Sequence, residues 1–304
     1  MPQNQARWDS ALSSQKILFV SGKGGVGKSL IAAGVARQQA NAGRRVLLVE
    51  IGDNSYYRDF FGLERLDYRP QSTELGFDLA MWSGETSLKD YVLYYLRIER
   101  VFRLFFANKV MRALINVAPG LNEISILGKI TSGVRRIGPP LLYDLIVVDC
   151  YATGHALALF RAPRGIFDAI GVGPMGTQSR EIEAVLQDPM ICGYAVVTLL
   201  EEMPVTETLE FRDELRRVLG VELAVIANKV MPVPVASHEL EALTAIDPGG
   251  LREFAKYLSA TARRQNQYLE ILSREFKGVG QVPLVFSNDP KELVEAAGEA
   301  LRQV

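Results

Sequence analysis

The sequence predicts an α/β fold in which a mostly parallel sheet is flanked by helices and carries an inserted helical subdomain. Three observations lead to this expectation. Short apolar runs alternate with helical segments along most of the chain, as in parallel sheets. A glycine-rich segment joins the first apolar run to the first helix, and apolar residues recur at three- and four-residue steps from about 86 to 136. We expect one domain over residues 1–304.

The expected strands are short and rich in Val, Ile and Leu, as strands covered on both faces are. They cover residues 16–20, 46–49, 145–148, 169–172, 194–199, 223–228 and 282–286. The first helix follows the glycine-rich segment and stops near Gly43, because glycine commonly ends helices. Later helices are expected over 248–276 and from about residue 290 onward.

The segment between the first strand and the first helix matches the phosphate-binding loop pattern G-x-x-x-x-G-K-[ST]. Its residues are Gly22, Lys23, Gly24, Gly25, Val26, Gly27, Lys28 and Ser29. Glycines let backbone N–H groups approach phosphate oxygens, and the following helix directs its N-terminus at the same anion. We expect Lys28 to contact the β- and γ-phosphates and the Ser29 hydroxyl to ligate Mg²⁺. The sequence therefore predicts a P-loop NTPase.

A carboxylate is expected beside this loop. Asp149 follows the apolar run at 145–148, so it lies at the carboxyl edge of the sheet, where parallel strands deliver ligand-binding residues. This is the Walker-B position of P-loop NTPases, and we expect Asp149 to hold Mg²⁺ directly or through water. The alternative role for Asp149 is an ordinary cap of the strand end.

The composition gives no reason to expect nucleic acid as a partner, because 34 Lys and Arg against 35 Asp and Glu leave a net charge of −1. The two cysteines, Cys150 and Cys192, form no C-x-x-C pair, so we expect no zinc site. Such sparse cysteines fit a reducing compartment. The N-terminal residues lack a signal-peptide pattern, and no apolar run of about 18 residues occurs. We therefore expect a cytoplasmic protein.

Four motifs, in order, resemble those of the ArsA family of ATPases. They are the loop from Gly22 to Ser29 with its additional Lys23, the run from Asp149 to His155, the run from Val197 to Thr208, and Asn228-Lys229-Val230. That family includes the arsenite pump ATPase and the targeting factor for tail-anchored membrane proteins. The similarity extends over roughly residues 16 to 230. It implies a homodimeric enzyme that hydrolyses ATP with Mg²⁺.

The resemblance also implies roles for single residues. Lys23 is similar to the lysine that crosses the dimer interface to the partner's phosphates, as an arginine finger does in other nucleotide hydrolases. Asn228 resembles the asparagine that recognises adenine, and Glu201 matches an acidic position that contacts the nucleotide. The segment from Pro283 to Asp289, which includes Phe286, resembles the loop that closes over the base. For Asn228 the alternative is an ordinary turn residue after a strand.

The sequence departs from the family at the carboxylate that orients the attacking water. The family has D-P-A-H after the second strand, whereas this chain places Gly52 at the aspartate position. Asp53 lies one residue later and Glu50 two residues earlier; we favour Asp53 as the catalytic carboxylate, with Glu50 as the alternative. The zinc cysteines of the targeting factors are absent after Asn228, and the chain has neither the tandem halves nor the thiol site of the arsenite ATPase.

ATP-driven closure of such a dimer is expected to produce a change of shape that an unidentified client or partner protein reads, with a membrane-associated protein as one candidate. The helical insertion is the candidate client surface, since it carries Tyr91, Tyr94, Tyr95, Phe102, Phe105 and Phe106. The alternative is that these rings pack the subdomain or the dimer interface, as aromatic residues at helical spacing usually do.

Two other functions stay open at this point. One is a positioning ATPase resembling MinD or ParA; the acidic residues Glu292, Glu295 and Glu299 near the C-terminus argue against it, because a membrane anchor is usually basic. The other is a nucleotide-binding scaffold with little hydrolysis, which the glycine at Gly52 suggests.

Overall fold

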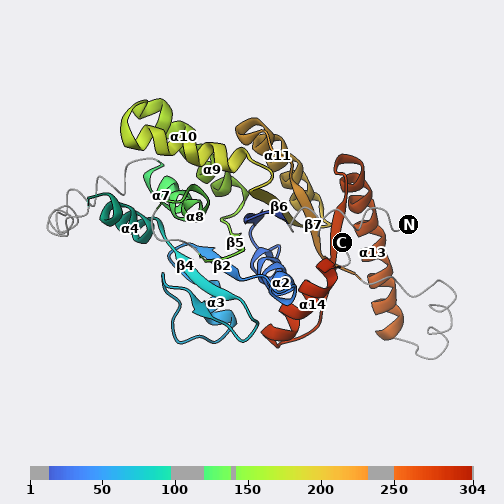
Figure 1. The fold of residues 1–304 in the computed structure, drawn as a ribbon. Coiled ribbons are helices and arrows are strands. Elements are labelled where there is room, and N and C mark those ends of the chain that lie inside the picture. The colour runs from blue at the N-terminus through green and yellow to red at the C-terminus, as the bar shows by residue number, and fades with distance from the viewer. Residues whose placement is uncertain (1–13, 97–119, 138–141, 232–249, 303–304) are drawn as a thin grey trace.

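The structure is a computed structural model that describes residues 14–96, 120–137, 142–231 and 250–302 (Figure 1). Within these ranges, eight strands form one sheet in the order β3-β4-β2-β5-β1-β6-β7-β8. The strands are β1 (Ile17–Gly22), β2 (Val46–Ile51), β3 (Gln71–Ser72), β4 (Asp78–Trp82), β5 (Leu145–Asp149), β6 (Cys192–Leu199), β7 (Ala224–Val230) and β8 (Val279–Pro283). All neighbours are parallel except β3 and β4. The predicted mostly parallel α/β sheet is confirmed.

Helices cover both faces of this sheet. They are α2 (Lys28–Asn41), α3 (Tyr56–Phe60), α4 (Gly84–Leu96), α7 (Leu121–Ile130), α8 (Ser132–Arg135), α9 (Thr153–Ile170), α10 (Gly173–Gln187), α11 (Glu202–Leu219), α13 (Gly250–Glu275) and α14 (Pro290–Arg302). Alternate residues of β1 show the division: Leu18 packs with α2 and α14, whereas Phe19 packs with α7, α9 and α11. Helix α14 lies against α2 on the face of the sheet to which Leu18 points (Figure 1).

The predicted strand at 169–172 is wrong. Ala169 and Ile170 are the last residues of α9, and Gly171, with a φ of 67°, turns the chain into α10. A buried strand would hide its apolar side chains, but Ile170 is 43% exposed and Val172 is 80% exposed. The short apolar run was therefore the end of an amphipathic helix, which a run of this length does not distinguish from a strand.

Two strands were not predicted, and one is shifted. β3 has only two residues, and β4 begins with the charged Asp78, so neither has the apolar run used to recognise strands. β8 begins at Val279, three residues before the expected start. Phe286, expected inside this strand, lies in the loop that follows it.

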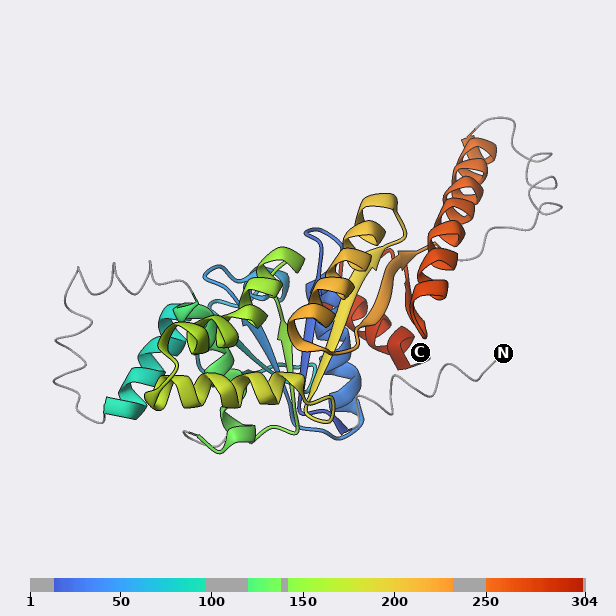
Figure 2. The same cartoon turned by 90° about the horizontal axis from the view of Figure 1, so that it is seen from above.

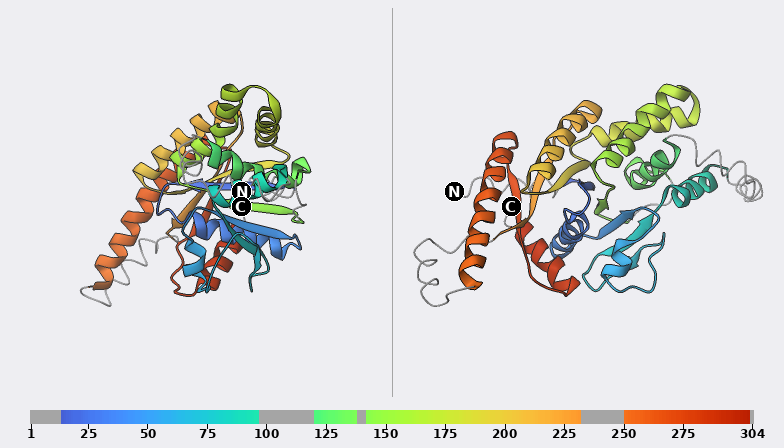
Figure 3. Two further views of the ribbon diagram at one scale, coloured as in Figure 1. Left: turned by 90° about the vertical axis from the view of Figure 1, so that its left-hand side faces the viewer. Right: turned by 180° about the vertical axis from the view of Figure 1, so that it is seen from behind.

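The predicted helical insertion contains α4, α7 and α8, with α4 packed on α7. Viewed from above, these helices lie at the end of the molecule opposite α13, which projects beyond β8 (Figure 2). The view from behind shows the same arrangement (Figure 3, right). Phe102, Phe105 and Phe106 lie outside the described residues, as do the side chains of Tyr91, Tyr94 and Tyr95. Among the described helices, none has both the length and the apolar content needed to cross a membrane.

Candidate nucleotide site

The residues that the sequence singles out gather at the carboxyl edge of the sheet. The strand order β2-β5-β1-β6-β7-β8 places the ends of these strands side by side. The residues there are Gly22 on β1, Glu50 on β2, Asp149 on β5, Asn228 on β7 and Pro283 on β8, with Glu201 following β6. Ligands of open parallel sheets bind at this edge. The fold therefore brings residues separated by up to 261 positions in the chain into one region.

The phosphate loop fits closely against its neighbours. Gly22 pairs with Val197 of β6, and a Cβ at Gly22 would lie 2.3 Å from the Val197 carbonyl oxygen, so only glycine fits. Gly27 is the N-cap of α2 with a left-handed φ of 90°, a conformation that glycine adopts without strain. These two glycines fix the start and the end of the loop.

The N-terminus of α2 suits an anion. Gly27 offers no side chain to cap it, and the first turn carries no acidic residue. No carboxylate of α2 therefore neutralises the positive end of the helix dipole, which stays available for an anion. The first turn of α2 is also held by α3. Tyr57 of α3 donates a hydrogen bond of 2.8 Å to the Ser29 carbonyl oxygen.

Asp149 lies buried beside this turn, with 5% exposure. Burial raises the pKa of Asp149 to about 6, while the Ser29 hydroxyl and the Lys28 charge act in the opposite direction. Its Oδ1 atom is buried and has no hydrogen-bond partner. A hard cation such as Mg²⁺ prefers oxygen ligands. The unpartnered carboxylate oxygen beside Ser29 fits such an ion, which Ser29 and Asp149 would hold.

Glu50 and Asp53 occupy different environments. Glu50 is the register partner of Asp149, is 6% exposed, and accepts hydrogen bonds from the Ser55 hydroxyl and, at 2.6 Å, from the Tyr56 N–H. Burial raises the pKa of Glu50. Asp53 is exposed in the turn after β2. Sequence reasoning did not find the role of Glu50 in closing the turn before α3.

Lys23 and Lys28 also differ in their surroundings. The positive charge of Lys28 lowers the pKa of Asp149 and so partly offsets the effect of burial. Lys23 instead forms an ion pair with Glu207, on the second turn of α11, and both side chains are about one-third exposed, at 35% and 29%. The two lysines of the loop thus have separate carboxylate neighbours.

Asn228 contacts the phosphate loop directly. The side chain is 2% exposed, and its Nδ2 atom donates a hydrogen bond of 2.9 Å to the Val26 carbonyl oxygen. A Cβ at Gly27 would lie 2.3 Å from the same Nδ2 atom. The glycine of the motif therefore leaves space for Asn228. No sequence signal identifies this contact, because Val26 and Asn228 are 202 positions apart.

The other predicted nucleotide contacts lie at the same edge, on segments outside the phosphate loop. Glu201 is the exposed N-cap residue of α11. Pro283 ends β8 opposite Val230, and Phe286 is 84% exposed in the segment that leads to α14. The side chains of Glu201, Pro283 and Phe286 are therefore accessible from solvent.

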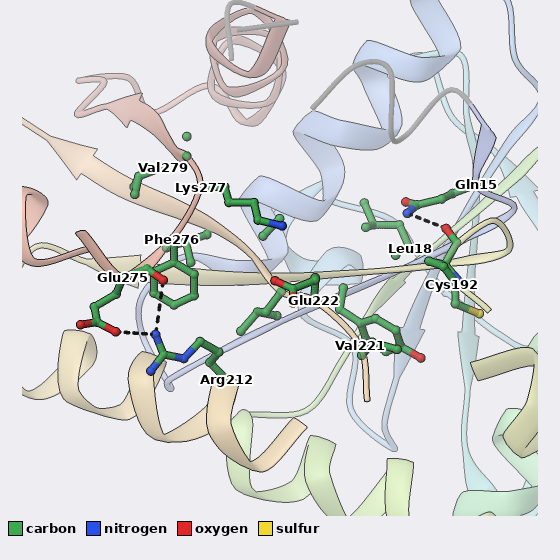
Figure 4. A pocket seen from close by; sticks show the side chains of 18 of the residues that line it. Gln15, Leu18, Cys192, Arg212, Val221, Glu222, Glu275, Phe276, Lys277 and Val279 are labelled. Carbon is green, nitrogen blue, oxygen red and sulfur yellow. Dashed lines mark hydrogen bonds and ion pairs between the residues drawn. The ribbon is translucent and has the colours of Figure 1, made fainter. Parts of the chain in front are cut away.

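A cavity of about 1130 Å³ lies at the opposite edge of the sheet. It is lined by the beginnings of β6 and β7, by the segment before β7 and by residues along β8 up to Pro283, and none of the phosphate-loop residues contributes to it (Figure 4). Figure 4 shows Phe276 and Val221 on its walls and Arg212 reaching Glu275. The cavity therefore shares Pro283 with the candidate nucleotide site but does not include the phosphate loop.

Comparisons with known proteins agree with this geometry. The family model of anion-transporting ATPases matches residues 15–171. ATPase BagA of Mycobacterium tuberculosis is 32% identical over 246 residues, which are 77% of this chain and 70% of that protein. A putative arsenical pump-driving ATPase of Halobacterium salinarum is 30% identical over 71% of this chain and 36% of its own length. An ATPase ASNA1 homolog of Plasmodium falciparum is 21% identical over 90% of this chain and 79% of that protein.

The matched region includes the phosphate loop and Asp149, and the similarity to the mycobacterial protein covers most of both chains. The chain therefore belongs to the ArsA family of ATPases and hydrolyses ATP.

Proposed function

We propose that the protein is a Mg²⁺-dependent ATPase switch that works as a homodimer, closing when it binds ATP and opening after hydrolysis. The observation that carries the proposal is the separation of the two loop lysines. Lys28 acts on Asp149, whereas Lys23 is held by Glu207 on α11. A partly exposed lysine at the rim of the site is suited to reach phosphates bound by a second subunit, where its charge stabilises the transition state.

Within one subunit, we assign the triphosphate to the loop from Gly22 to Ser29 and to the N-terminus of α2. Lys28 contacts the β- and γ-phosphates, and backbone N–H groups of the loop donate to phosphate oxygens. Ser29 and Asp149 hold the cation. Mg²⁺, when bound, supplies positive charge that offsets the charge on the phosphate oxygens.

We assign the orientation of the attacking water to Asp53. Both carboxylate oxygens of Glu50 already accept hydrogen bonds from the turn before α3. Asp53 is exposed, so its carboxylate is accessible to a water molecule. Gly52 precedes it with a φ of 153°, in a region that side-chain-bearing residues rarely adopt, so the turn has a backbone freedom that an aspartate at this position would lack.

We assign the base to the region between β7 and the segment after β8. The amide of Asn228 has one further N–H and one further lone pair beyond the bonds it makes in the protein, so it can still pair with adenine. Pro283 and Phe286 lie on the adjacent strand end and loop, and Glu201 lies on the other side, after β6. The exposed ring of Phe286 is available to cover a base by stacking.

We propose that a client or partner protein reads the closed dimer. The ring of Tyr56 and the side chain of Met203, near the nucleotide edge, are 46% and 59% exposed, so this face retains apolar surface for a second chain. A membrane anchor of the MinD type is less well supported, because the apolar side of α14 packs on α2 through Val294, Ala297 and Leu301. An arsenical cargo is not favoured either, since Cys150 and Cys192 are both buried.

The proposal is tested by measuring dimerisation and ATP turnover in parallel. Light scattering follows the mass of the wild-type protein with and without ATP and Mg²⁺. Lys23→Ala is expected to bind ATP yet to lose ATP-dependent dimerisation and most turnover. The control is Lys277→Ala, which removes an exposed lysine at the far edge of the sheet. A Lys23→Ala protein that dimerises and turns over normally refutes the switch.

A further inference from the structure

The phosphate loop is connected to helix α13 by a continuous series of hydrogen bonds. Asn228 donates to the Val26 carbonyl oxygen at 2.9 Å and accepts from the Lys229 N–H at 2.9 Å. Gln265 of α13 then holds both sides of the next turn. Its Oε1 accepts from the Met231 N–H at 2.8 Å, and its Nε2 donates to the Lys229 carbonyl oxygen at 3.2 Å.

The turn that Gln265 holds has an unusual backbone. Lys229 has a φ of 54°, in the left-handed region that residues with a Cβ rarely adopt. The pairing of β7 with β8 also shifts register between Ala227 and Val230. Such irregularities persist only where surrounding contacts maintain them, and bulges of this kind re-aim a neighbouring side chain. The side chain that this irregular turn carries is that of Asn228, which reaches the phosphate loop.

Helix α13 is itself fixed at this end. Leu272, two turns after Gln265, is fully buried in the core. Arg212 of α11 pairs with Glu275 at 2.8 Å, and its guanidinium lies 5.2 Å from the centre of the Phe276 ring (Figure 4). Gln265 therefore projects from an anchored part of the helix, and its amide has a defined position relative to the turn.

We infer that Gln265 is a positioning residue of the nucleotide site, acting through the 229–231 turn and Asn228 on the phosphate loop. The inference rests on the proposed binding of ATP at that loop. Without the two bonds from Gln265, the left-handed turn relaxes, the Asn228 amide moves, and the Val26 carbonyl loses its partner. The loop then spends less time in the shape that receives phosphates, and the affinity for phosphate falls.

This role differs from base recognition in what it affects. A residue that sets the shape of the loop changes the affinity for any triphosphate, with or without a base. A residue that reads adenine changes the ratio of ATP to GTP affinity. The inference therefore predicts a loss of affinity for ATP, GTP and inorganic tripolyphosphate by the same factor when Gln265 is altered.

The test uses titration calorimetry on the full chain with inorganic tripolyphosphate, ATP and GTP. Gln265→Ala is expected to weaken all three about fivefold to tenfold, the effect of losing two modest hydrogen bonds at one remove. Gln265→Glu keeps the acceptor for Met231 but loses the donor to Lys229, so an intermediate loss is expected. The matched control is Gln267→Ala, an exposed glutamine on the same helix, for which a change of less than about twofold is expected.

Coupling is measured by a double-mutant cycle with Asn228→Ala. In the Asn228→Ala background the series of bonds is already broken, so adding Gln265→Ala is expected to change the tripolyphosphate affinity by less than about twofold. Multiplicative losses would overturn the inference, because they would show that Gln265 acts by another route. Circular dichroism checks that each variant is folded, and Gln265→Glu serves if Gln265→Ala is not.

Failure of the inference is distinguishable from failure of the proposed function. If wild type binds ATP and Lys28→Ala does not, the loop is the nucleotide site. Normal tripolyphosphate binding by a folded Gln265→Ala protein then overturns the role of Gln265 alone. If neither wild type nor Gln265→Ala binds ATP or tripolyphosphate, both fail.

Discussion

Replacing Asp149 with asparagine is expected to stabilise the nucleotide-free protein while abolishing its activity. Burial raises the pKa of Asp149 from 3.8 to about 6. The folded state thus binds the proton more tightly than the unfolded state, and ionisation of this carboxylate lowers the free energy of unfolding as pH rises from about 4 to about 6. Above that range the penalty is complete and amounts to about 3 kcal/mol.

The penalty disappears in Asp149→Asn, which has no charge to bury. The gain over wild type is expected to be about 3 kcal/mol at pH 7.5 and about 1 kcal/mol at pH 4.5, less any hydrogen bond that the amide fails to make with Ser29. The gain in the free energy of unfolding therefore differs by about 2 kcal/mol between the two pH values. A lost hydrogen bond that costs the same at both pH values leaves this difference unchanged. Turnover with Mg²⁺ and ATP should be lost, because the carboxylate proposed to hold the cation is gone.

Urea unfolding of the nucleotide-free protein at both pH values measures this difference. Asp168→Asn is the control, because Asp168 forms an exposed pair with Arg164 and its removal should shift the free energy of unfolding by less than about 1 kcal/mol. An Asp149→Asn protein that is less stable than wild type at pH 7.5, or whose advantage does not grow with pH, would refute the reasoning from burial.

Three further predictions concern the site. Lys28→Ala should lower ATP affinity at least about a hundredfold, since it removes the charge facing the β- and γ-phosphates; near-normal binding by calorimetry would show that another group holds the triphosphate. Asp53→Asn should slow steady-state turnover more than tenfold with unchanged ATP affinity, whereas Glu50→Gln should slow turnover less; the reverse ranking assigns the water to Glu50. Asn228→Ala should reduce the preference for ATP over GTP in competition binding, and an unchanged preference would remove Asn228 from base recognition.

The parts of the site that are contiguous in the chain were predictable from the sequence. The loop from Gly22 to Ser29 is one motif, and the structure places it between β1 and α2 as expected. Asp149 ends a buried strand, and neighbouring strands place it beside Ser29. Both predictions needed only a local pattern and the rule that parallel strands end at one edge.

Contacts between distant segments were not predictable. The pairing of Lys23 with Glu207 joins residues 184 positions apart, and the bond from Asn228 to Val26 joins residues 202 positions apart. Such pairs depend on strand order and on the bulge in β7, neither of which leaves a pattern in the local sequence. The false strand at 169–172 has a similar cause, because the exposure of Ile170 depends on packing of the whole of α9.

The proposed switch requires that Lys23 act on the nucleotide bound by the other subunit. Lys23→Ala and Lys28→Ala proteins, each expected to be inactive alone, are mixed and assayed for ATP turnover. If Lys23 acts across the interface, a mixed dimer contains one complete site that neither parent protein can assemble alone, so turnover is expected to reappear in the mixture. A mixture that stays as inactive as its parts, although the subunits exchange, would contradict the claim.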